Sequence, residues 1–189
     1  MNLSVLFNIP NIVGYIRIFL LIFGNYKSKT IFILCYSLSS ALDFFDGFLA
    51  RKYNQSSILG KCLDMFTDRV STVVISLRCI RDKFPLYNFI SAYVIIDLLS
   101  HMFHFYLSAI ENTQHKECTN LILSIYYYKP FLFSICFLTE LFFIYCVSNI
   151  KRGYLFNVLY CSAICKMGFH IVQLASALSR LSDHKEKLD

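Results

Sequence analysis

The chain has 189 residues, of which 57% are hydrophobic and only 16% are charged, and its formal net charge is +6. A water-soluble domain of this length carries more charge, so the composition argues against a soluble enzyme and predicts one membrane-embedded domain over residues 1–189. The lysines and arginines are scattered along the chain instead of forming one basic stripe, which argues against nucleic-acid binding.

Hydrophobic segments of roughly membrane-spanning length alternate with polar breaks, as expected for helices that cross a lipid bilayer. In chain order they cover residues 9–23, 30–50, 60–80, 86–110, 130–150 and 154–178. Pro10 is typical of a helix start, and we expect Asn11 to cap that helix. Residues 121–128 are ambiguous and suit a short segment at the membrane interface. The predicted fold is an all-α integral membrane bundle of six transmembrane helices.

Eight cysteines are spread through the sequence, and seven of them lie in apolar segments. They form no C-x-x-C pair, and small buried thiols are common in apolar helices. We therefore expect free thiols, including Cys118 in the polar loop after the fourth segment.

Four aspartates lie at the facing ends of the second and third segments, joined by a short polar loop. They are Asp43, Asp46, Asp64 and Asp68. Helical spacing places each pair on one helix face, so a hairpin of the two segments brings four carboxylates to one membrane surface. Carboxylates near lipid are costly and persist mainly where they bind something, and an all-oxygen ligand set suits a hard divalent cation.

A simpler interpretation of these acids is also open. Arg51 follows the first pair and Arg69 follows the second. Ion pairs with these two arginines would explain some of the aspartates without any metal, although two arginines do not neutralise four carboxylates.

The residues around the aspartates have a fixed spacing that includes two glycines, an alanine and an arginine. The pattern reads Asp43-x2-Asp46-Gly47-x2-Ala50-Arg51-x8-Gly60-x3-Asp64-x3-Asp68. It resembles, position for position, the signature of the CDP-alcohol phosphatidyltransferase family. The resemblance implies that an alcohol attacks the β-phosphate of a CDP-linked lipid and that CMP leaves. It also implies a two-metal site for Mg²⁺ or Mn²⁺ on the four aspartates, with Asp68 as the general base as well.

Some of the neighbouring residues are candidates for binding the CDP-linked lipid. They are Gly47, Ala50, Arg51, Ser57 and Gly60. Small residues let a flat nucleotide or another helix approach the backbone, and the resemblance favours the cytidine end of the substrate. The arginine offers a fork of donors to phosphate oxygens, although a snorkelling side chain at a helix end has the same pattern. The serine hydroxyl is a further donor to those phosphates.

Flanking stretches narrow the resemblance to one branch of the family. PNIVGYIRI, LDMFTDR and SHMFHF are similar to the eukaryotic phosphatidylinositol synthases. This likeness implies CDP-diacylglycerol as the donor, myo-inositol as the acceptor, the endoplasmic reticulum as the location and a homodimer as the assembly. We place the aspartates on the cytosolic side, where a CDP-linked substrate and a CMP product suit the compartment.

Polar residues inside the apolar segments are candidates for the inositol pocket, namely Arg69, Asp97, His101 and Lys166. Asp97 and His101 are four residues apart, so they share a helix face and are expected to pair. A zinc site on His101 and His104 is disfavoured, because no good set of further ligands is evident. Arg17 and Lys166 lie within spans and should face a cavity, an acid or a phosphate.

Alternative functions stay open at this point. A relative in the same family would use glycerol 3-phosphate, serine or an amino-alcohol as its acceptor. A cation transporter would also place carboxylates in a membrane, but transporters usually carry internal repeats and acids near the bilayer midplane. The aspartates here lie toward one membrane face, which favours the enzyme.

Overall fold

The structure is a computed structural model that describes residues 3–82, 84–111, 121–148, 150–151 and 153–183. The described residues form helices and their connections, and they contain no strand. The chain divides into two compact units, Met1–Phe84 and Pro85–Asp189, called here the N-terminal and C-terminal units. The all-α prediction is confirmed, whereas the single domain over residues 1–189 stays a prediction.

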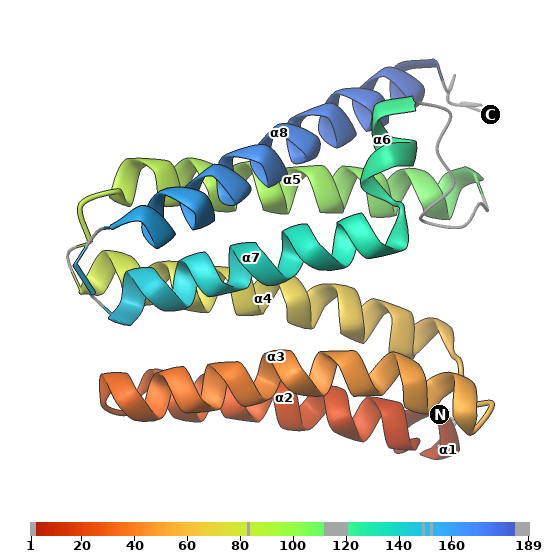
Figure 1. Cartoon of the computed structure of the whole chain (residues 1–189). Coiled ribbons are helices and arrows are strands. Elements are labelled where there is room, and N and C mark those ends of the chain that lie inside the picture. Colours follow the sequence, from red (N-terminus) through yellow and green to blue (C-terminus); the bar gives the residue numbers. More distant parts are fainter. Residues whose placement is uncertain (1–2, 83, 112–120, 149, 152, 184–189) are drawn as a thin grey trace. The chain divides into compact units, whose positions relative to one another are not determined.

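The N-terminal unit is built around the second helix, which packs against the third and the fourth (Figure 1). Its helices are α1 Leu3–Leu6, α2 Ile9–Asn25, α3 Lys29–Lys52 and α4 Ile58–Arg81. Two glycines permit this close approach. A Cβ on Gly14 would lie 2.7 Å from the Leu63 side chain of α4, and one on Gly24 would lie 2.8 Å from Cβ of Cys35 on α3.

The start of α2 corrects one expectation. Asn8, and not Asn11, is the N-cap: its side-chain oxygen accepts the backbone N–H of Asn11 at 3.0 Å. Pro10 lies within the first helical turn, where its missing N–H costs no hydrogen bond, so the cap lies two residues before it. Asn11 instead donates its side-chain amide to the Val5 carbonyl at 2.7 Å.

The other end of the N-terminal unit is fixed by Arg78 of α4. Its guanidinium donates to the Lys27 carbonyl at 3.2 Å, in the turn between α2 and α3. It also lies over the Phe32 ring, 5.0 Å from the ring centroid. These contacts hold the end of α4 against the α2–α3 turn, so that all three helices are tied together away from the aspartates.

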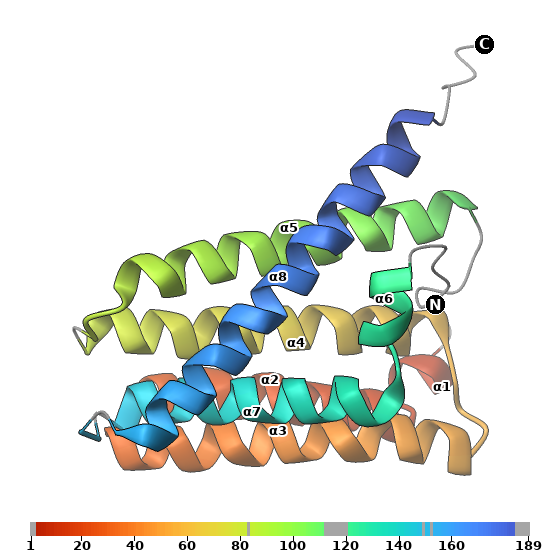
Figure 2. The same ribbon diagram turned by 45° about the horizontal axis from the view of Figure 1, so that its top comes forward.

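The C-terminal unit is organised by its last helix, which contacts the three other helices of the unit and crosses α5 obliquely (Figure 2). Its helices are α5 Tyr87–Glu111, α6 Leu121–Tyr126, α7 Lys129–Ser148 and α8 Tyr154–Asp183. Aromatic rings fill its interior: Phe142 is fully buried and meets Phe89 and Phe143 edge to face. The segment expected to be ambiguous forms the short helix α6.

Among the described residues, four helices, α3, α5, α7 and α8, are long and apolar enough to cross a membrane. The protein is therefore an integral membrane protein. The remaining long helices are α2, which has 17 residues, and α4, which carries several charged residues. Their membrane crossing, and thus the count of six spans, stays a prediction.

Within the described part of the chain, seven cysteines are free thiols, as expected. The prediction for Cys118 lies outside the described residues.

Candidate active site

One buried arginine lies close to all four of the predicted metal-binding aspartates. The Arg17 side chain on α2 is 2% exposed, and its Nη1 lies 2.7 Å from Asp43 Oδ1 and 2.9 Å from Asp46 Oδ2. The same nitrogen is 3.4 Å from Asp64 Oδ1, and Nη2 is 2.6 Å from Asp68 Oδ1. The predicted convergence of the two aspartate pairs is therefore present, and three helices contribute to it.

The loop between α3 and α4 is tied to the start of α2. The Asn8 side-chain amide donates to the Gln55 carbonyl at 3.1 Å, and the Ile9 backbone N–H donates to Gln55 Oε1 at 3.0 Å. Asn54 turns the loop with a φ of 54°, a left-handed conformation that asparagine tolerates better than most residues. This anchor holds the facing ends of α3 and α4 beside α2.

The carboxylates differ in their access to solvent. The Asp46 side chain is 10% exposed, whereas those of Asp43, Asp64 and Asp68 are 41%, 51% and 35% exposed. Oxygen atoms of the three exposed aspartates all lie within 4.8 Å of one another. Four carboxylates outnumber the one guanidinium that they share, and such an oxygen-only set fits a hard divalent cation. The donor set thus agrees with the predicted metal centre.

Gly47 and Gly60, both candidates for nucleotide binding, have different surroundings. A Cβ on Gly60 would lie 3.0 Å from Asn11 Oδ1 and 3.2 Å from Ser57 Oγ, so helix packing accounts for the absence of a side chain. A Cβ on Gly47 would meet only the Arg51 guanidinium, at an ordinary 3.5 Å. Packing among the described residues therefore does not explain Gly47.

The other three candidates lie around these glycines. Ser57 is the N-cap of α4, and its hydroxyl oxygen accepts the Gly60 N–H at 3.0 Å. The hydroxyl hydrogen stays available for donation to a ligand. Arg51 is exposed and folds back beside Gly47, while Ala50 is half-buried one residue earlier.

The sequence left open that the aspartates simply form ion pairs with Arg51 or Arg69. In the structure their closest cationic partner is a different arginine. Arg17 makes the close contacts, and the Arg69 guanidinium lies farther from the cluster, with Nη2 3.9 Å from Asp68 Oδ2. The sequence indicated that Arg17 faces an acid, a phosphate or a cavity, but not that it contacts four acids. The available signal was an arginine in the middle of an apolar segment.

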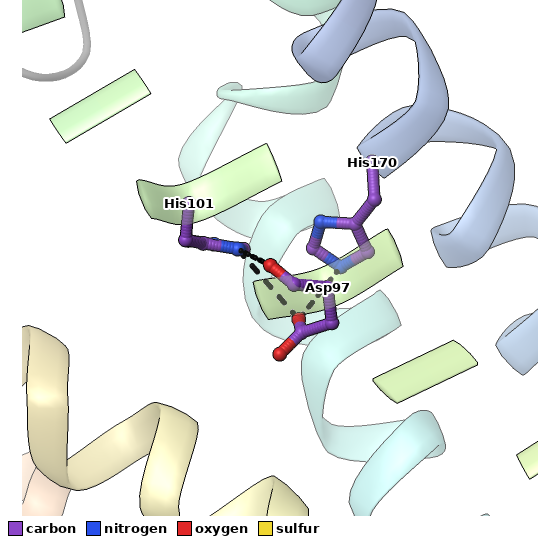
Figure 3. Close-up of side chains that lie close together, drawn as sticks. All are labelled: Asp97, His101 and His170. Carbon is purple, nitrogen blue, oxygen red and sulfur yellow. Dashed lines mark hydrogen bonds and ion pairs between the residues drawn. The ribbon is translucent and has the colours of Figure 1, made fainter. Parts of the chain in front are cut away.

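The remaining candidates lie in the C-terminal unit. Asp97 and His101 pair as expected, with His101 Nδ1 3.7 Å from Asp97 Oδ1. His170 of α8 joins them, with Nε2 3.3 Å from the same oxygen, as Figure 3 shows. Lys166 is buried one helical turn before His170. Sequence reasoning missed His170, although its spacing from Lys166 places both on one face of α8.

The model of the CDP-alcohol phosphatidyltransferase family matches residues 1–163. The chain belongs to this family. All the signature positions of this phosphatidyltransferase, from Asp43 to Asp68, lie in the N-terminal unit on α3 and α4.

Curated relatives of this phosphatidyltransferase carry one shared name, CDP-diacylglycerol–inositol 3-phosphatidyltransferase. The Saccharomyces cerevisiae protein is 39% identical over 149 residues, which cover 74% of this chain and 67% of the yeast protein. The Candida albicans protein is 38% identical (71% and 62% covered), and the Homo sapiens protein is 35% identical (71% and 67% covered). The chain thus spans about two-thirds of the length of these relatives. No solved structure gives a significant match.

Proposed function

We propose that this enzyme transfers the phosphatidyl group from CDP-diacylglycerol to myo-inositol, giving phosphatidylinositol and CMP. The observation that carries the proposal is the shared name of the relatives, which are 35–39% identical to the chain. The aspartate cluster supplies the chemistry that such a transfer needs, because a pyrophosphate leaving group requires charge neutralisation.

Asp43, Asp46, Asp64 and Asp68 are the residues that would hold Mg²⁺ or Mn²⁺, and the bound ions would neutralise the pyrophosphate and stabilise CMP as it leaves. Arg17, in the middle of α2, holds the carboxylates of α3 and α4 together. The three exposed aspartates face the side from which substrate arrives, and Asp46 supports them from a buried position.

Asp68 is the proposed general base. Its carboxylate is 35% exposed and therefore reachable by an incoming alcohol. It takes the proton from one inositol hydroxyl as the oxygen attacks the β-phosphorus, and the bond from that phosphorus to the CMP oxygen breaks. The proton ends on Asp68 and the bonding electrons leave with CMP.

The donor lipid is proposed to lie over the α3–α4 hairpin. Gly47 supports this placement, because its missing side chain leaves backbone open beside Arg51 and packing gives no other reason for it. Arg51 offers its donors to the phosphates, and the Ser57 hydroxyl adds another. Ala50 and Gly60 complete the small-residue surface for the cytidine end.

For the acceptor, Arg69 is the proposed inositol contact that adjoins the aspartate cluster, through Asp68. Asp97, His101 and Lys166 stay predictions for this role. The Asp97 side chain is 1% exposed and faces two imidazoles, an arrangement that suits a small ion better than a polyol.

The proposed location is the endoplasmic reticulum membrane, with the aspartates facing the cytosol and the protein forming a homodimer. The apolar helices support membrane insertion, and a water-soluble CMP product supports the cytosolic side. The same family chemistry with glycerol 3-phosphate, serine or an amino-alcohol is the alternative within the enzyme class, and cation transport is the alternative outside it.

An acceptor screen tests the proposal directly. Purified protein in detergent receives CDP-diacylglycerol and Mg²⁺ or Mn²⁺, and CMP release is followed with inositol, glycerol 3-phosphate, serine or no alcohol. We expect release only with inositol and its loss on chelation. Release with another alcohol would overturn the acceptor, and the absence of release with every alcohol in a folded protein would favour the transporter.

A further inference from the structure

One carboxylate and two imidazoles form a cluster inside the C-terminal unit. Asp97 and His101 lie one turn apart on α5, and His170 faces them from α8 (Figure 3). One possible ligand atom from each residue lies within 4.8 Å of the others. Asp97 and His170 are each 1% exposed, and His101 is 15% exposed. Ionisable side chains are expensive in an apolar bundle, and where they gather they usually bind something.

Ser100 contacts both histidines of the cluster. Its hydroxyl donates to the Asp97 carbonyl at 3.0 Å, and the same oxygen lies 3.3 Å from His101 Nδ1 and 3.3 Å from His170 Nδ1. With Nδ1 of His170 turned to Ser100, Nε2 is the ring nitrogen that faces the carboxylate, 3.3 Å from Asp97 Oδ1. This nitrogen and this oxygen are the two atoms between which a cation would lie.

The spacing of the ligand atoms matches a tetrahedral metal. Zinc–nitrogen and zinc–oxygen bonds of about 2.1 Å put neighbouring ligand atoms ~3.4 Å apart. The distances from Asp97 Oδ1 are 3.3 Å to His170 Nε2 and 3.7 Å to His101 Nδ1. Shifts of a few tenths of an ångström would complete these two edges of the coordination shell.

We propose that Asp97, His101 and His170 form a second metal site, which takes a zinc-class divalent cation. His101 Nδ1 lies 2.9 Å from the Asp97 carbonyl and donates its hydrogen there. When the ion binds, the neutral ring changes tautomer: the hydrogen moves from Nδ1 to Nε2 by exchange with solvent, and the Nδ1 lone pair turns to the metal. Ser100 stays bonded to Nδ1 of His170 and fixes the ring, as partners of metal-bound histidines usually do.

The ligand chemistry separates this site from the aspartate cluster. Two imidazoles and one carboxylate favour zinc-class ions, whereas four carboxylates favour magnesium and manganese. Aromatic rings surround His170: the centroids of Tyr93 and Tyr126 lie 6.1 Å and 6.3 Å from its own. An enclosed apolar site of this kind strengthens metal–ligand attraction, because it excludes competing water.

Removal of the positive charge of Lys166 is a second test of the same site. It is 8% exposed on α8 and interacts electrostatically with Asp97. Its ammonium group competes with a metal ion for that carboxylate. Lys166→Met should therefore tighten zinc binding, whereas a cluster that binds no metal should not respond in this way.

The experiment measures metal content in the purified full chain. Chelator-stripped protein in detergent is incubated with ZnCl2 in excess MgCl2, which occupies the aspartate cluster, and bound zinc is counted after gel filtration. We expect about one zinc per chain, with affinity lowered by at least ~10-fold in His170→Gln and Asp97→Asn. His104→Gln, on the same helix, is the matched control and should keep zinc. Zinc content that is equal in all variants, or absent from the parent protein, would overturn the site.

Cysteine thiolates are the main alternative ligands for a zinc-class ion, and the visible spectrum of bound Co²⁺ distinguishes sulfur ligands from nitrogen and oxygen ligands. Co²⁺ on nitrogen and oxygen ligands gives visible d–d bands without a sulfur-to-cobalt charge-transfer band. Such a charge-transfer band would place the ion on a cysteine and contradict the proposal. If His170→Gln elutes as aggregate, His101→Asn provides the second test. Because metal content is independent of turnover, failure of this site and failure of the proposed transferase activity are distinguishable.

Discussion

At the scale of single residues, Arg17 is the centre of the candidate active site. Its one guanidinium contacts four carboxylates, and it is more deeply buried than any of them. A buried guanidinium normally costs free energy unless its partners compensate for the lost hydration. In the metal-free protein, the aspartates and Arg17 therefore stabilise one another.

Arg17→Leu should destabilise the metal-free protein, because the carboxylates then repel each other without a cation. We expect a Tm lower by roughly 5–10 °C in chelator, after allowance for the partial exposure of the carboxylates. Mg²⁺ should restore much of the loss, since it replaces the missing charge. Arg17→Lys is the control that keeps a positive charge, and an unchanged Tm in chelator for Arg17→Leu would contradict this role.

Asp68→Asn tests the proposed base with nearly the same shape and no proton-accepting carboxylate. We expect CMP release to fall by about 10²–10⁴-fold, while the Tm in chelator stays within a few degrees of the parent. Asp46→Asn, at a buried supporting position, is the comparison. A rate for Asp68→Asn within tenfold of the parent would remove Asp68 as the base.

Gly47→Val separates substrate binding from packing. A Cβ there meets only the Arg51 guanidinium, so stability should hardly change. If the nucleotide approaches this backbone, the KM for CDP-diacylglycerol should rise at least ~10-fold, as expected when a substrate is displaced. Gly168→Val is the matched control, because its added Cβ meets no described side chain or neighbouring helix within 4 Å. An unchanged KM would place the nucleotide elsewhere.

At the scale of helices, close approach of α2 to α3 depends on Gly24. Its added Cβ would lie 2.8 Å from Cβ of Cys35, an atom fixed to the backbone. Gly24→Ala should therefore cost about 1–3 kcal/mol through overpacking. Gly168→Ala should be neutral or stabilise by up to ~1 kcal/mol, because alanine favours the helix. Equal Tm values for the two variants, measured by thermal unfolding in detergent, would show that α2 and α3 can separate without cost.

The sequence predicted the positions of the helices well and the contacts between helices less well. The apolar runs place the long helices within a few residues, because hydrophobic periodicity is a local signal. The α3–α4 hairpin also follows from the short polar loop. The contact of Arg17 with that hairpin depends on how α2 packs, which local periodicity does not encode. Asn8 was missed as the cap because a proline near a helix start allows more than one cap position. His170 was missed beside Asp97 because α5 and α8 are far apart in sequence, and their packing is not a local signal.

At the scale of the whole molecule, membrane crossing by α4 decides whether the α3–α4 loop and the end of α8 lie on the same side of the membrane. Between the α3–α4 loop and the end of α8, the chain passes along α4, α5, α7 and α8. If all four cross, Asn54 and Ser182 lie on the same side of the membrane. If α4 does not cross, they lie on opposite sides.

Labelling of sealed microsomes with an impermeant maleimide shows on which side of the membrane each of these two positions lies. Asn54→Cys and Ser182→Cys should both react from the cytosolic side, each compared with the parent to subtract the native thiols. Labelling of only one of the two would reduce the number of spans and revise the proposed topology.

The contact between Arg17 and the hairpin also sets an order of events during synthesis. Arg17 leaves the ribosome with α2, whereas Asp46 follows 29 residues later and Asp64 and Asp68 follow 47 and 51 residues later. An isolated arginine at the centre of a membrane helix costs about 3 kcal/mol, so α2, if it crosses the membrane, has little reason to settle in lipid alone. Its stable insertion is then coupled to delivery of the second and third apolar segments, and the early chain depends on the translocation machinery until these counter-charges arrive.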